Sequence, residues 1–390
     1  MIGTNTNHRS RRILMVIDTL EVGGTERSLL DLCRHLDQAA FSPVVCHLYT
    51  GGALAPAFRD AGVPVHAFDI SGKYHFARAF RQLSRLVREL DADVIHTMLY
   101  RADQVGRAVG RWHRIPVVSS LVGVPHEPVR FDNNPHLSRS KHAVLKRLDR
   151  ISARWVTRFH SVSHEVQDSY CRHLGIDARR VTVVPRGRSQ PATKPAAATR
   201  TSLGIDDDTL LLLNVGRLVP QKGQRDLVDA MVPVVAAHPK TRLLIAGDGW
   251  LNQELEARIR DHGLTDHITL LGRRHDVPDL LTAADLFVFP TLYEGLPGAV
   301  VEAMLSETPI VGSDIASLRE ALTHTRTAML VPPQSPQRLA MALLELIGQP
   351  AIRKQMAEAA RADALERFDI LTVTRQIEAI YRDALADVNQ

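Results

Sequence analysis

The sequence predicts an α/β protein of two doubly wound domains, each a parallel sheet with helices on both faces. Short apolar runs alternate with amphipathic helical segments along the 390-residue chain, as repeated strand–helix units require. The length suits two domains with separate hydrophobic cores. Between two such series, residues 190–200 are rich in Pro, Ala and Thr and show no apolar period. We interpret that stretch as the linker between the domains.

Each strand is expected at a short apolar run that follows a helical segment or a turn. The first helix begins at Thr25, after a glycine-containing loop, and another spans 75–90. Continuous apolar runs such as 286–290 suit sheets that are covered on both faces. The expected strands are 13–18, 43–49, 63–70, 93–98, 116–122, 155–163, 181–185, 210–216, 242–247, 268–272, 286–290, 309–314 and 328–332. Helices are expected at 226–238, 251–263, 299–305, 336–348 and 372–388.

The formal charge of +5 is unevenly distributed along the chain. Residues 1–195 carry 29 Lys/Arg and 17 Asp/Glu, whereas the remaining residues carry 19 and 26. A basic half favours an anionic partner, such as a membrane surface or a phosphorylated substrate. The same excess of Lys and Arg also occurs in proteins where the charges only keep the surface soluble. No recognition motif for nucleic acid accompanies the charge, so we expect no nucleic-acid partner.

One basic segment sharpens this expectation. Residues 139–158 hold seven basic residues and one acid, with apolar residues at helical spacing. Two interpretations stay open for this helix: it binds an anionic membrane surface or a phosphorylated substrate, or it is an ordinary packed helix.

The chain carries no signal for membrane insertion or secretion. No apolar run reaches the ~18 residues that a membrane span needs, and the N-terminal residues lack the apolar core of a signal peptide. Cys33, Cys46 and Cys171 lack metal-site spacing and fit reduced thiols. We therefore expect a cytoplasmic protein, with any membrane contact peripheral and at the inner face.

Polar residues follow successive strands of the second half. Arg217 and Lys222 follow the strand at 210–216, Arg274 follows 268–272, and Glu294 follows 286–290. Ligands collect outside the carboxyl ends of strands in open α/β sheets. Two cations on one loop suit a diphosphate that gains negative charge as it leaves.

The segment after Glu294 opens a further helix. Pro297 fits a first helical turn, which would turn the N–H groups of Gly298 and Ala299 toward an anion. Glu302 lies in the second turn, so Glu294 and Glu302 can face one crevice and bind sugar hydroxyls. Each residue alone is equally an ordinary surface charge. Their recurrence at the ends of successive strands indicates a site.

Three segments in the second half carry a resemblance to a known family. They are GRLVPQKG (216–223), IAGDG (245–249) and EGLPGAVVE (294–302), which has its two acids separated by seven residues. With VGGTE and DVIHT in the first half, the chain resembles retaining glycosyltransferase family 4, of the GT-B fold. The resemblance implies two Rossmann-like domains facing a central cleft. It places the acceptor in an N-terminal domain (1–190) and the nucleotide-sugar donor in a C-terminal domain (200–369). It also implies a final helix, about 370–390, that crosses back to the N-terminal domain.

The resemblance also implies roles for individual residues. Arg217 and Lys222 would hold the donor diphosphate and stabilise the leaving group, and Glu294 would bind the transferred sugar. These three form the expected catalytic set, and Glu302 would bind the ribose. Transfer would retain the anomeric configuration without a metal or other cofactor, and the acceptor would be a glycan or a lipid-linked saccharide. Further donor contacts are implied for Gly23, Gly24, Arg274, Pro297, Gly298 and Ala299.

The chain departs from the family pattern on the acceptor side. Val122 and Met98 stand where the family often has His, and Arg186-Gly187-Arg188-Ser189 replaces an Asn-Gly-hydrophobic-Asp pattern. His126, four residues after Val122, is a candidate substitute for the missing His. The acceptor-side candidates are His96, His126 and Arg186.

Other readings of the chain are weaker or remain as alternatives. Asp91-Ala-Asp93 has the acid spacing of metal-dependent glycosyltransferases, but it precedes a strand and so lies at the wrong end of the sheet. No G-x-G-x-x-G follows the first strand and no P-loop is present. A nucleotide-sugar epimerase or hydrolase of the same fold, and a non-catalytic sugar-nucleotide-binding protein, remain alternatives.

Overall fold

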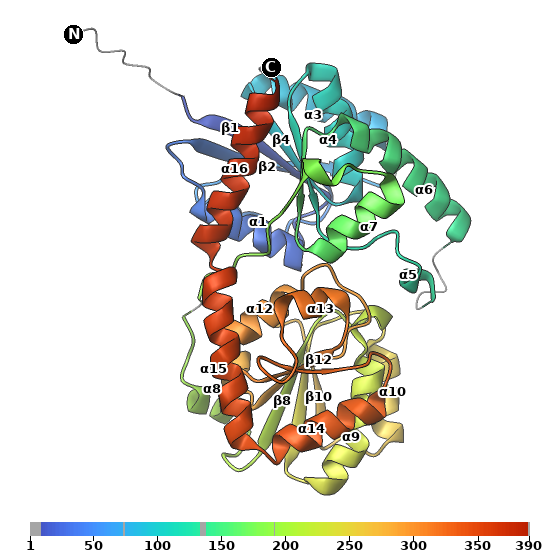
Figure 1. Ribbon diagram of the computed structural model, residues 1–390, viewed down its shortest axis with the longest axis vertical. Helices are drawn as coiled ribbons and strands as arrows, with labels where there is room; N and C mark the ends of the chain where they lie inside the picture. The colour runs from blue at the N-terminus through green and yellow to red at the C-terminus, as the bar shows by residue number, and fades with distance from the viewer. Residues whose placement is uncertain (1–8, 73–74, 133–137, 191, 389–390) are drawn as a thin grey trace, which may run out of the picture. The chain divides into compact units, whose positions relative to one another are not determined.

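The computed structural model describes residues 9–72, 75–132, 138–190 and 192–388, and its chain folds into two parallel sheets with helices (Figure 1). The chain divides into two compact units. The first unit comprises the described residues up to His126, Ser138–Gly187 and the residues from Ile370 onward. The second comprises Arg188–Asp369 together with the short helix α5 (Val129–Asp132). The predicted α/β class with two Rossmann-like domains is confirmed.

The sheet of the first unit has seven strands, all parallel, and each lies where the apolar runs predict one. In spatial order they are β3 (Val65–Ile70), β2 (Phe41–Tyr49), β1 (Arg11–Ile17), β4 (Val94–Met98), β5 (Val117–Leu121), β6 (Arg158–Ser161) and β7 (Val181–Val183).

The helices of the first unit cover this sheet, and the last helix of the chain is one of them. The apolar face of α16 shares one buried cluster with β1, in which Ile377 and Tyr381 accompany Ile13 and Met15. The expected return of the C-terminal helix is therefore confirmed. The helices are α1 (Gly24–His35), α2 (Ala55–Asp60), α3 (Phe76–Leu90), α4 (Tyr100–His113), α6 (Arg139–Ser152), α7 (His164–Leu174) and α16 (Ile370–Val388).

The second unit repeats the design with a six-stranded parallel sheet. In spatial order its strands are β10 (Ile268–Gly272), β9 (Thr241–Ala246), β8 (Leu210–Val215), β11 (Leu286–Phe289), β12 (Ile310–Ser313) and β13 (Met329–Val331). Its helices are α8 (Ala196–Ser202), α9 (Gln224–Ala237), α10 (Asn252–Asp261), α11 (Val277–Ala283), α12 (Gly298–Leu305), α13 (Ala316–Ala321), α14 (Pro336–Ile347) and α15 (Pro350–Arg367), together with α5.

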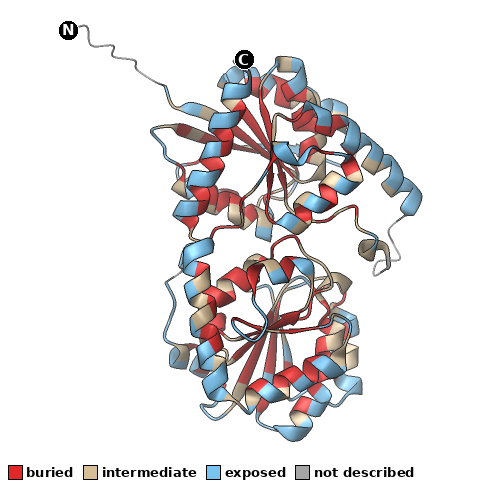
Figure 2. Ribbon diagram, in the orientation of Figure 1, coloured by how far each residue is buried: buried red, intermediate tan, exposed pale blue. Residues whose placement is uncertain are grey.

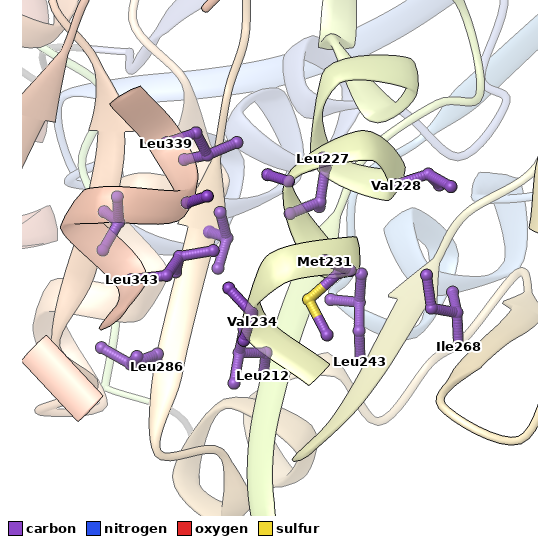
Figure 3. Close-up of a cluster of buried hydrophobic side chains, with 14 of the residues drawn as sticks. Leu212, Leu227, Val228, Met231, Val234, Leu243, Ile268, Leu286, Leu339 and Leu343 are labelled. Atoms are coloured by element: carbon purple, nitrogen blue, oxygen red, sulfur yellow. The ribbon is translucent and has the colours of Figure 1, made fainter. Parts of the chain in front are cut away.

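The core of the second unit shows why its strands are continuous apolar runs. Leu212 of β8 and Leu243 of β9 pack against Met231 of α9, while Leu343 of α14 packs in the same cluster (Figure 3). The central strands of both sheets are buried along most of their length (Figure 2), whereas β3, β7 and β10 are largely half-buried or exposed. Full burial of one such side chain stabilises the fold by about 1.5–3 kcal/mol.

The structure corrects two expectations about element bounds and adds a helix that was not predicted. The predicted linker 190–200 contains the start of α8, because its alanines favour helix and Thr199 and Arg200 are buried there. The basic helix expected over 139–158 ends at Ser152 and is followed by one 3₁₀ turn, Ala153–Trp155, before β6. Helix α4 had no prediction, since its buried face includes Asp103 and Arg107 as well as apolar residues. No helix within the described ranges is long and apolar enough to cross a membrane.

A buried polar network joins α4 to α6. The Arg107 side chain is 0% exposed, and its Nη1 lies 2.6 Å from Asp149 Oδ1 while Nη2 lies 3.3 Å from Asp103 Oδ2. His126 Nε2 lies 3.0 Å from the other oxygen of Asp149. Burial raises the pKa of Asp103 to about 7. Burial also opposes ionisation of Asp149, but the hydrogen bond from His126 and the charge of Arg107 outweigh it and lower its pKa.

Removing the central cation of this network should destabilise the first unit. Arg107→Met leaves Asp103 and Asp149 buried without their shared cation, so we expect the free energy of unfolding to fall by about 3–5 kcal/mol. Urea denaturation followed by circular dichroism measures the change. Arg111→Met, on the exposed side of the same helix, is the matched control and should stay within about 0.5 kcal/mol of the wild type. Equal effects of the two substitutions would contradict the assignment.

Candidate active site

The order of strands in the second unit creates a natural ligand site beside β8. From β8 the sheet continues through β9 and β10 on one side and through β11, β12 and β13 on the other. The chain leaves β8 toward β9 and leaves β11 toward β12, in opposite directions across the sheet, so the carboxyl ends of β8 and β11 mark the position where open α/β sheets bind ligands. Arg217 and Lys222 lie on the loop after β8 and Glu294 lies on the loop after β11.

Lys222 and Glu294 meet at these strand ends. The ammonium Nζ of Lys222 pairs with Glu294 Oε1, and Thr291 Oγ1 donates a hydrogen bond of 2.8 Å to the same oxygen. Both charged side chains are largely buried. The ammonium also lies 5.0 Å from the centroid of the Phe289 ring, which favours a cation. The contact places a cation and a carboxylate of the expected catalytic set at one point.

Backbone contacts fix the two loops to each other. The Gln221 carbonyl accepts hydrogen bonds from Leu292 N at 2.8 Å and Thr291 Oγ1 at 3.0 Å, and its side-chain Nε2 donates to the Tyr293 carbonyl at 2.7 Å. Gly223 has φ +66°, and a Cβ at this position would stand 2.0 Å from the Pro290 carbonyl oxygen. Glycine therefore lets the loop of Lys222 approach the loop of Glu294 closely.

Arg217 contributes a second positive charge near these loops. Its carbonyl accepts a hydrogen bond of 3.1 Å from Gln224 Nε2, which ties it to the start of α9. Burial raises the pKa of the Tyr293 hydroxyl, while the charges of Arg130 and Arg217 oppose the rise. The guanidinium of Arg217 therefore acts electrostatically on the residue next to Glu294.

Glu302 is paired with Arg188, a residue that was not among the expected donor contacts. Arg188 Nε donates a hydrogen bond of 3.0 Å to Glu302 Oε1, and the Arg188 side chain is almost fully buried. A Cβ at Gly298 would stand 2.2 Å from Arg188 Nη2, so the guanidinium covers the first residue of α12. Arg188 therefore lies at the start of α12, next to Glu302.

The first turn of α12 differs slightly from the expectation. Pro297 is the residue before the helix, with an extended backbone, and not part of its first turn. Val300 N donates to the Pro297 carbonyl at 3.1 Å, so the N–H groups of Gly298 and Ala299 stand at the open end of the helix.

Arg274 lies away from the paired residues. It follows β10, and β9 lies between β10 and β8 in the sheet. Its Nη2 forms an ion pair of 2.6 Å with Asp276 Oδ2. Its Nε and Nη2 both donate to the Asp276 carboxylate. The donor contact that the resemblance implies here is one from the backbone near Arg274.

Family models match both halves of the chain. The model described as Glycosyltransferase Family 4 matches residues 22–189, and the model described as Glycosyl transferases group 1 matches residues 196–363. The chain belongs to glycosyltransferase family 4. It is a glycosyltransferase, and its donor is a nucleotide-diphosphate sugar.

Characterised glycosyltransferases are similar over most of the chain. The chain is 25% identical over 313 residues to the UDP-Gal:α-D-GlcNAc-diphosphoundecaprenol α-1,3-galactosyltransferase of Escherichia coli, which covers 78% of this chain and 79% of that protein. It is 29% identical over 284 residues to the 2-deoxystreptamine N-acetyl-D-glucosaminyltransferase of Streptomyces fradiae, covering 67% of this chain and 66% of that protein.

Solved structures show the same fold. HepE of Anabaena, crystallised with UDP and glucose, superposes with a TM-score of 0.83 at 24% identity over 95% of this chain and 98% of that chain. Sucrose-phosphate synthase from Thermosynechococcus elongatus gives 0.82 at 19% identity over 97% and 100% of the two chains. The predicted GT-B fold of this family 4 member is thereby confirmed.

The first unit of this glycosyltransferase holds the expected glycine loop beside Arg186. A Cβ at Gly23 would stand 2.3 Å from Glu26 Oε2, and one at Gly24 would stand 3.7 Å from Arg186 Nη1. The Gly24 carbonyl accepts a hydrogen bond of 2.8 Å from the same nitrogen. Arg186 therefore lies against the loop after β1.

The two histidines expected on the acceptor side lie in different surroundings. His96 is buried, with Nδ1 2.7 Å from Tyr381 Oη and Nε2 2.7 Å from Ser120 Oγ. His126 belongs to the buried network of Asp149, and its Nδ1 lies 3.3 Å from His142 Nε2. Both ring nitrogens of each histidine thus have partners within the protein.

Asp93 has a structural environment at the opposite end of the first sheet. Its Oδ2 accepts from Arg12 N at 2.8 Å and its Oδ1 accepts from Arg11 Nη1 at 3.0 Å, which fastens the start of β4 to β1. The structural interpretation of the Asp91-Ala-Asp93 spacing is confirmed.

The Lys222–Glu294 pair allows a test by double substitution. Lys222→Ala and Glu294→Ala should each lower kcat at least ~100-fold, as loss of an electrostatic stabiliser does. The double variant should lose less than the product of the two effects, because the residues act as a unit. Initial rates with saturating donor measure the effect. Glu256→Ala, on the exposed face of α10, is the control; near wild-type rates in both site variants would show that the site lies elsewhere.

Proposed function

We propose that this protein is a retaining, metal-independent hexosyltransferase that moves a sugar from a nucleotide diphosphate to a glycan or a lipid-linked saccharide. The observation that carries the proposal is the contact of Lys222 with Glu294 where β8 and β11 end. It joins a cation suited to a diphosphate to a carboxylate suited to sugar hydroxyls.

The donor is held by residues of the second unit. Arg217 and Lys222 bind the diphosphate, Glu294 accepts hydrogen bonds from hydroxyls of the transferred sugar, and Glu302 accepts from the ribose. The N–H groups of Gly298 and Ala299 meet a phosphate, and the backbone near Arg274 meets the base. Support comes from the pairing of Lys222 with Glu294 and from the open end of α12.

The reaction needs no protein nucleophile. The bond between the sugar C1 and the diphosphate oxygen breaks while the acceptor oxygen attacks C1 from the same face. The acceptor proton passes to the departing phosphate oxygen. Negative charge builds up on the departing diphosphate oxygen as the bond breaks, before the proton reaches it, and Arg217 with Lys222 stabilises that charge in place of a metal ion.

The stereochemistry and metal requirement can be tested together. We expect the product to keep the anomeric configuration of the donor, as seen by proton NMR of the new linkage, and the rate to be unchanged in excess EDTA. UDP-, GDP- and ADP-sugars should first be compared by thermal shift to find the donor. A ligand that binds only the folded protein raises the melting temperature of the protein. An inverted product, or full loss of rate in EDTA that Mg²⁺ restores, would overturn this mechanism.

We also propose that α6 carries the enzyme to an anionic membrane surface. Four apolar side chains of this basic segment are exposed: Val144 60%, Leu148 47%, Ile151 42% and Trp155 39%. The helix instead buries Asp149 and Ser152, which anchor it to the unit, and its outer face is exposed (Figure 2). An apolar face flanked by Lys and Arg is typical of helices that lie in a membrane interface.

The names of two similar enzymes specify lipid-bound acceptors. One is the Escherichia coli galactosyltransferase for a diphosphoundecaprenol-linked sugar. The other, 33% identical over 48% of this chain, is the monoacylated phosphatidylinositol monomannoside mannosyltransferase of Corynebacterium glutamicum. They support a lipid-linked acceptor for this enzyme. We propose that the acceptor stays in the membrane, that the donor is in solution and that the enzyme works at the inner face.

Vesicle binding tests the role of α6. Val144→Ser with Leu148→Ser should weaken binding to vesicles of phosphatidylglycerol at least ~10-fold, since each buried leucine or valine contributes about 1.5–3 kcal/mol. Binding should also weaken as salt rises. Met341→Ser, an exposed apolar residue of α14 in the second unit, is the matched control. Equal binding of both variants in a sedimentation assay would remove the membrane proposal and leave the transfer mechanism untouched.

A further inference from the structure

The first unit contains an apolar pocket at the carboxyl ends of β4, β5 and β6. Leu29 and Leu32 of α1 form one wall, and Val373 of α16 forms another. Met98 and Val162, from the ends of β4 and β6, complete the apolar lining. The pocket offers about 50 Å³ of space for the centres of water-sized groups. One water needs about 10–15 Å³, so the pocket has room for a short branched hydrocarbon group.

The floor of the pocket is polar but fully engaged. His160 Nε2 lies 2.8 Å from the Val184 carbonyl, which can only accept, so this nitrogen donates. His160 Nδ1 then accepts from Ser120 Oγ at 2.7 Å, and Ser120 Oγ accepts from His96 Nε2 at 2.7 Å. His96 Nδ1 finally accepts from the Tyr381 hydroxyl at 2.7 Å.

Burial keeps both histidines of this chain of hydrogen bonds neutral. Burial lowers the pKa of His96 to about 3 and that of His160 to about 4, and the positive charge of Arg186 contributes to the second shift. Each polar group of the floor is satisfied by its neighbour. The space above therefore favours an apolar group over water or a sugar.

Arg186 places a positive charge at the edge of this apolar space. Its Nη1 donates to the Gly24 carbonyl at 2.8 Å and to Ser28 Oγ at 3.1 Å, and its Nη2 lies 3.4 Å from Thr25 Oγ1. Thr25 and Ser28 also line the pocket, and both are only half-buried. A guanidinium with two hydroxyls beside it is suited to a phosphate group.

Three departures from the family pattern meet in this pocket. Met98, Val122 and Arg186, which the sequence analysis noted separately, all line it. Two of them make the pocket more apolar and the third supplies the charge. The combination matches a ligand that has an apolar part and an anionic part.

We propose that this pocket binds the first apolar carbons of a prenyl or alkyl phosphate, with the phosphate at Arg186, Thr25 and Ser28. The inference rests on the proposed function, because such a phosphate would be the lipid end of the acceptor. Binding in the pocket is nevertheless measurable without transfer.

Isothermal titration calorimetry with geranyl phosphate tests the pocket in the full chain. We expect geranyl phosphate to bind at least ~10-fold more tightly than geraniol or inorganic phosphate, since neither of these has both parts. Dihexanoyl phosphatidic acid distinguishes the source: tighter binding of geranyl phosphate indicates a prenyl ligand, and tighter binding of phosphatidic acid indicates an acylglycerol ligand. Equal affinity for geranyl phosphate and geraniol would overturn the proposal.

Two variants locate the binding. Val122→Phe fills the pocket from its half-buried edge, and Arg186→Gln removes the charge; each should weaken geranyl phosphate at least ~10-fold. Arg59→Gln, an exposed arginine of α2, is the matched control and should bind like the wild type. If Arg186→Gln fails to fold, as judged by its melting curve, the affinity of Val122→Phe for geranyl phosphate alone tests the location of the site. Wild-type affinity in Val122→Phe would show that the ligand binds elsewhere.

Donor binding separates this inference from the proposed function. If the wild type binds and uses a nucleotide sugar but does not bind geranyl phosphate, only the pocket assignment fails. If it binds no nucleotide sugar, the proposed function fails as well.

Discussion

The parallel pairing of β8 with β11 is the constraint on which the catalytic proposal depends. These strands are neighbours in the sheet although Lys222 and Glu294 are 72 residues apart in the chain. The direction in which the chain proceeds across the sheet reverses between them, and ligands of open α/β sheets bind at the strand ends where this reversal occurs. A cation and a carboxylate therefore meet where β8 and β11 end.

The first unit has the same reversal of strand order, between β1 and β4, but carries different chemistry at its strand ends. The second unit places charged side chains there, which suit a diphosphate and a sugar. In the first unit, His96, Ser120 and His160 satisfy one another, and leucine, valine and methionine side chains surround the remaining space. In our proposals, the same strand order thus binds a polar donor in one unit and an amphipathic phosphate in the other.

Helix α6 buries polar residues and exposes apolar ones, which is the reverse of the usual arrangement in a surface helix. It is fastened through Asp149, which Arg107 and His126 hold in a buried network, while Val144 and Leu148 remain exposed. An ion pair in a protein interior contributes little net stability over an apolar contact, but breaking it is costly. The arrangement keeps the helix attached while its apolar residues stay available for a second surface.

The sequence by itself determined the α/β class, every strand of both sheets and the loop positions of Arg217, Lys222 and Glu294, because buried parallel strands need continuous apolar runs whose ends are visible as polar residues. It also identified the segment of α6, but helical spacing alone does not tell whether an apolar stripe is packed or exposed. Only the tertiary structure decided that Arg188 covers Glu302 and the first residue of α12, and that Met98, Val122 and Arg186 share one pocket. These relations join residues from separate segments, and their distances depend on strand order and side-chain packing, which local periodicity does not encode.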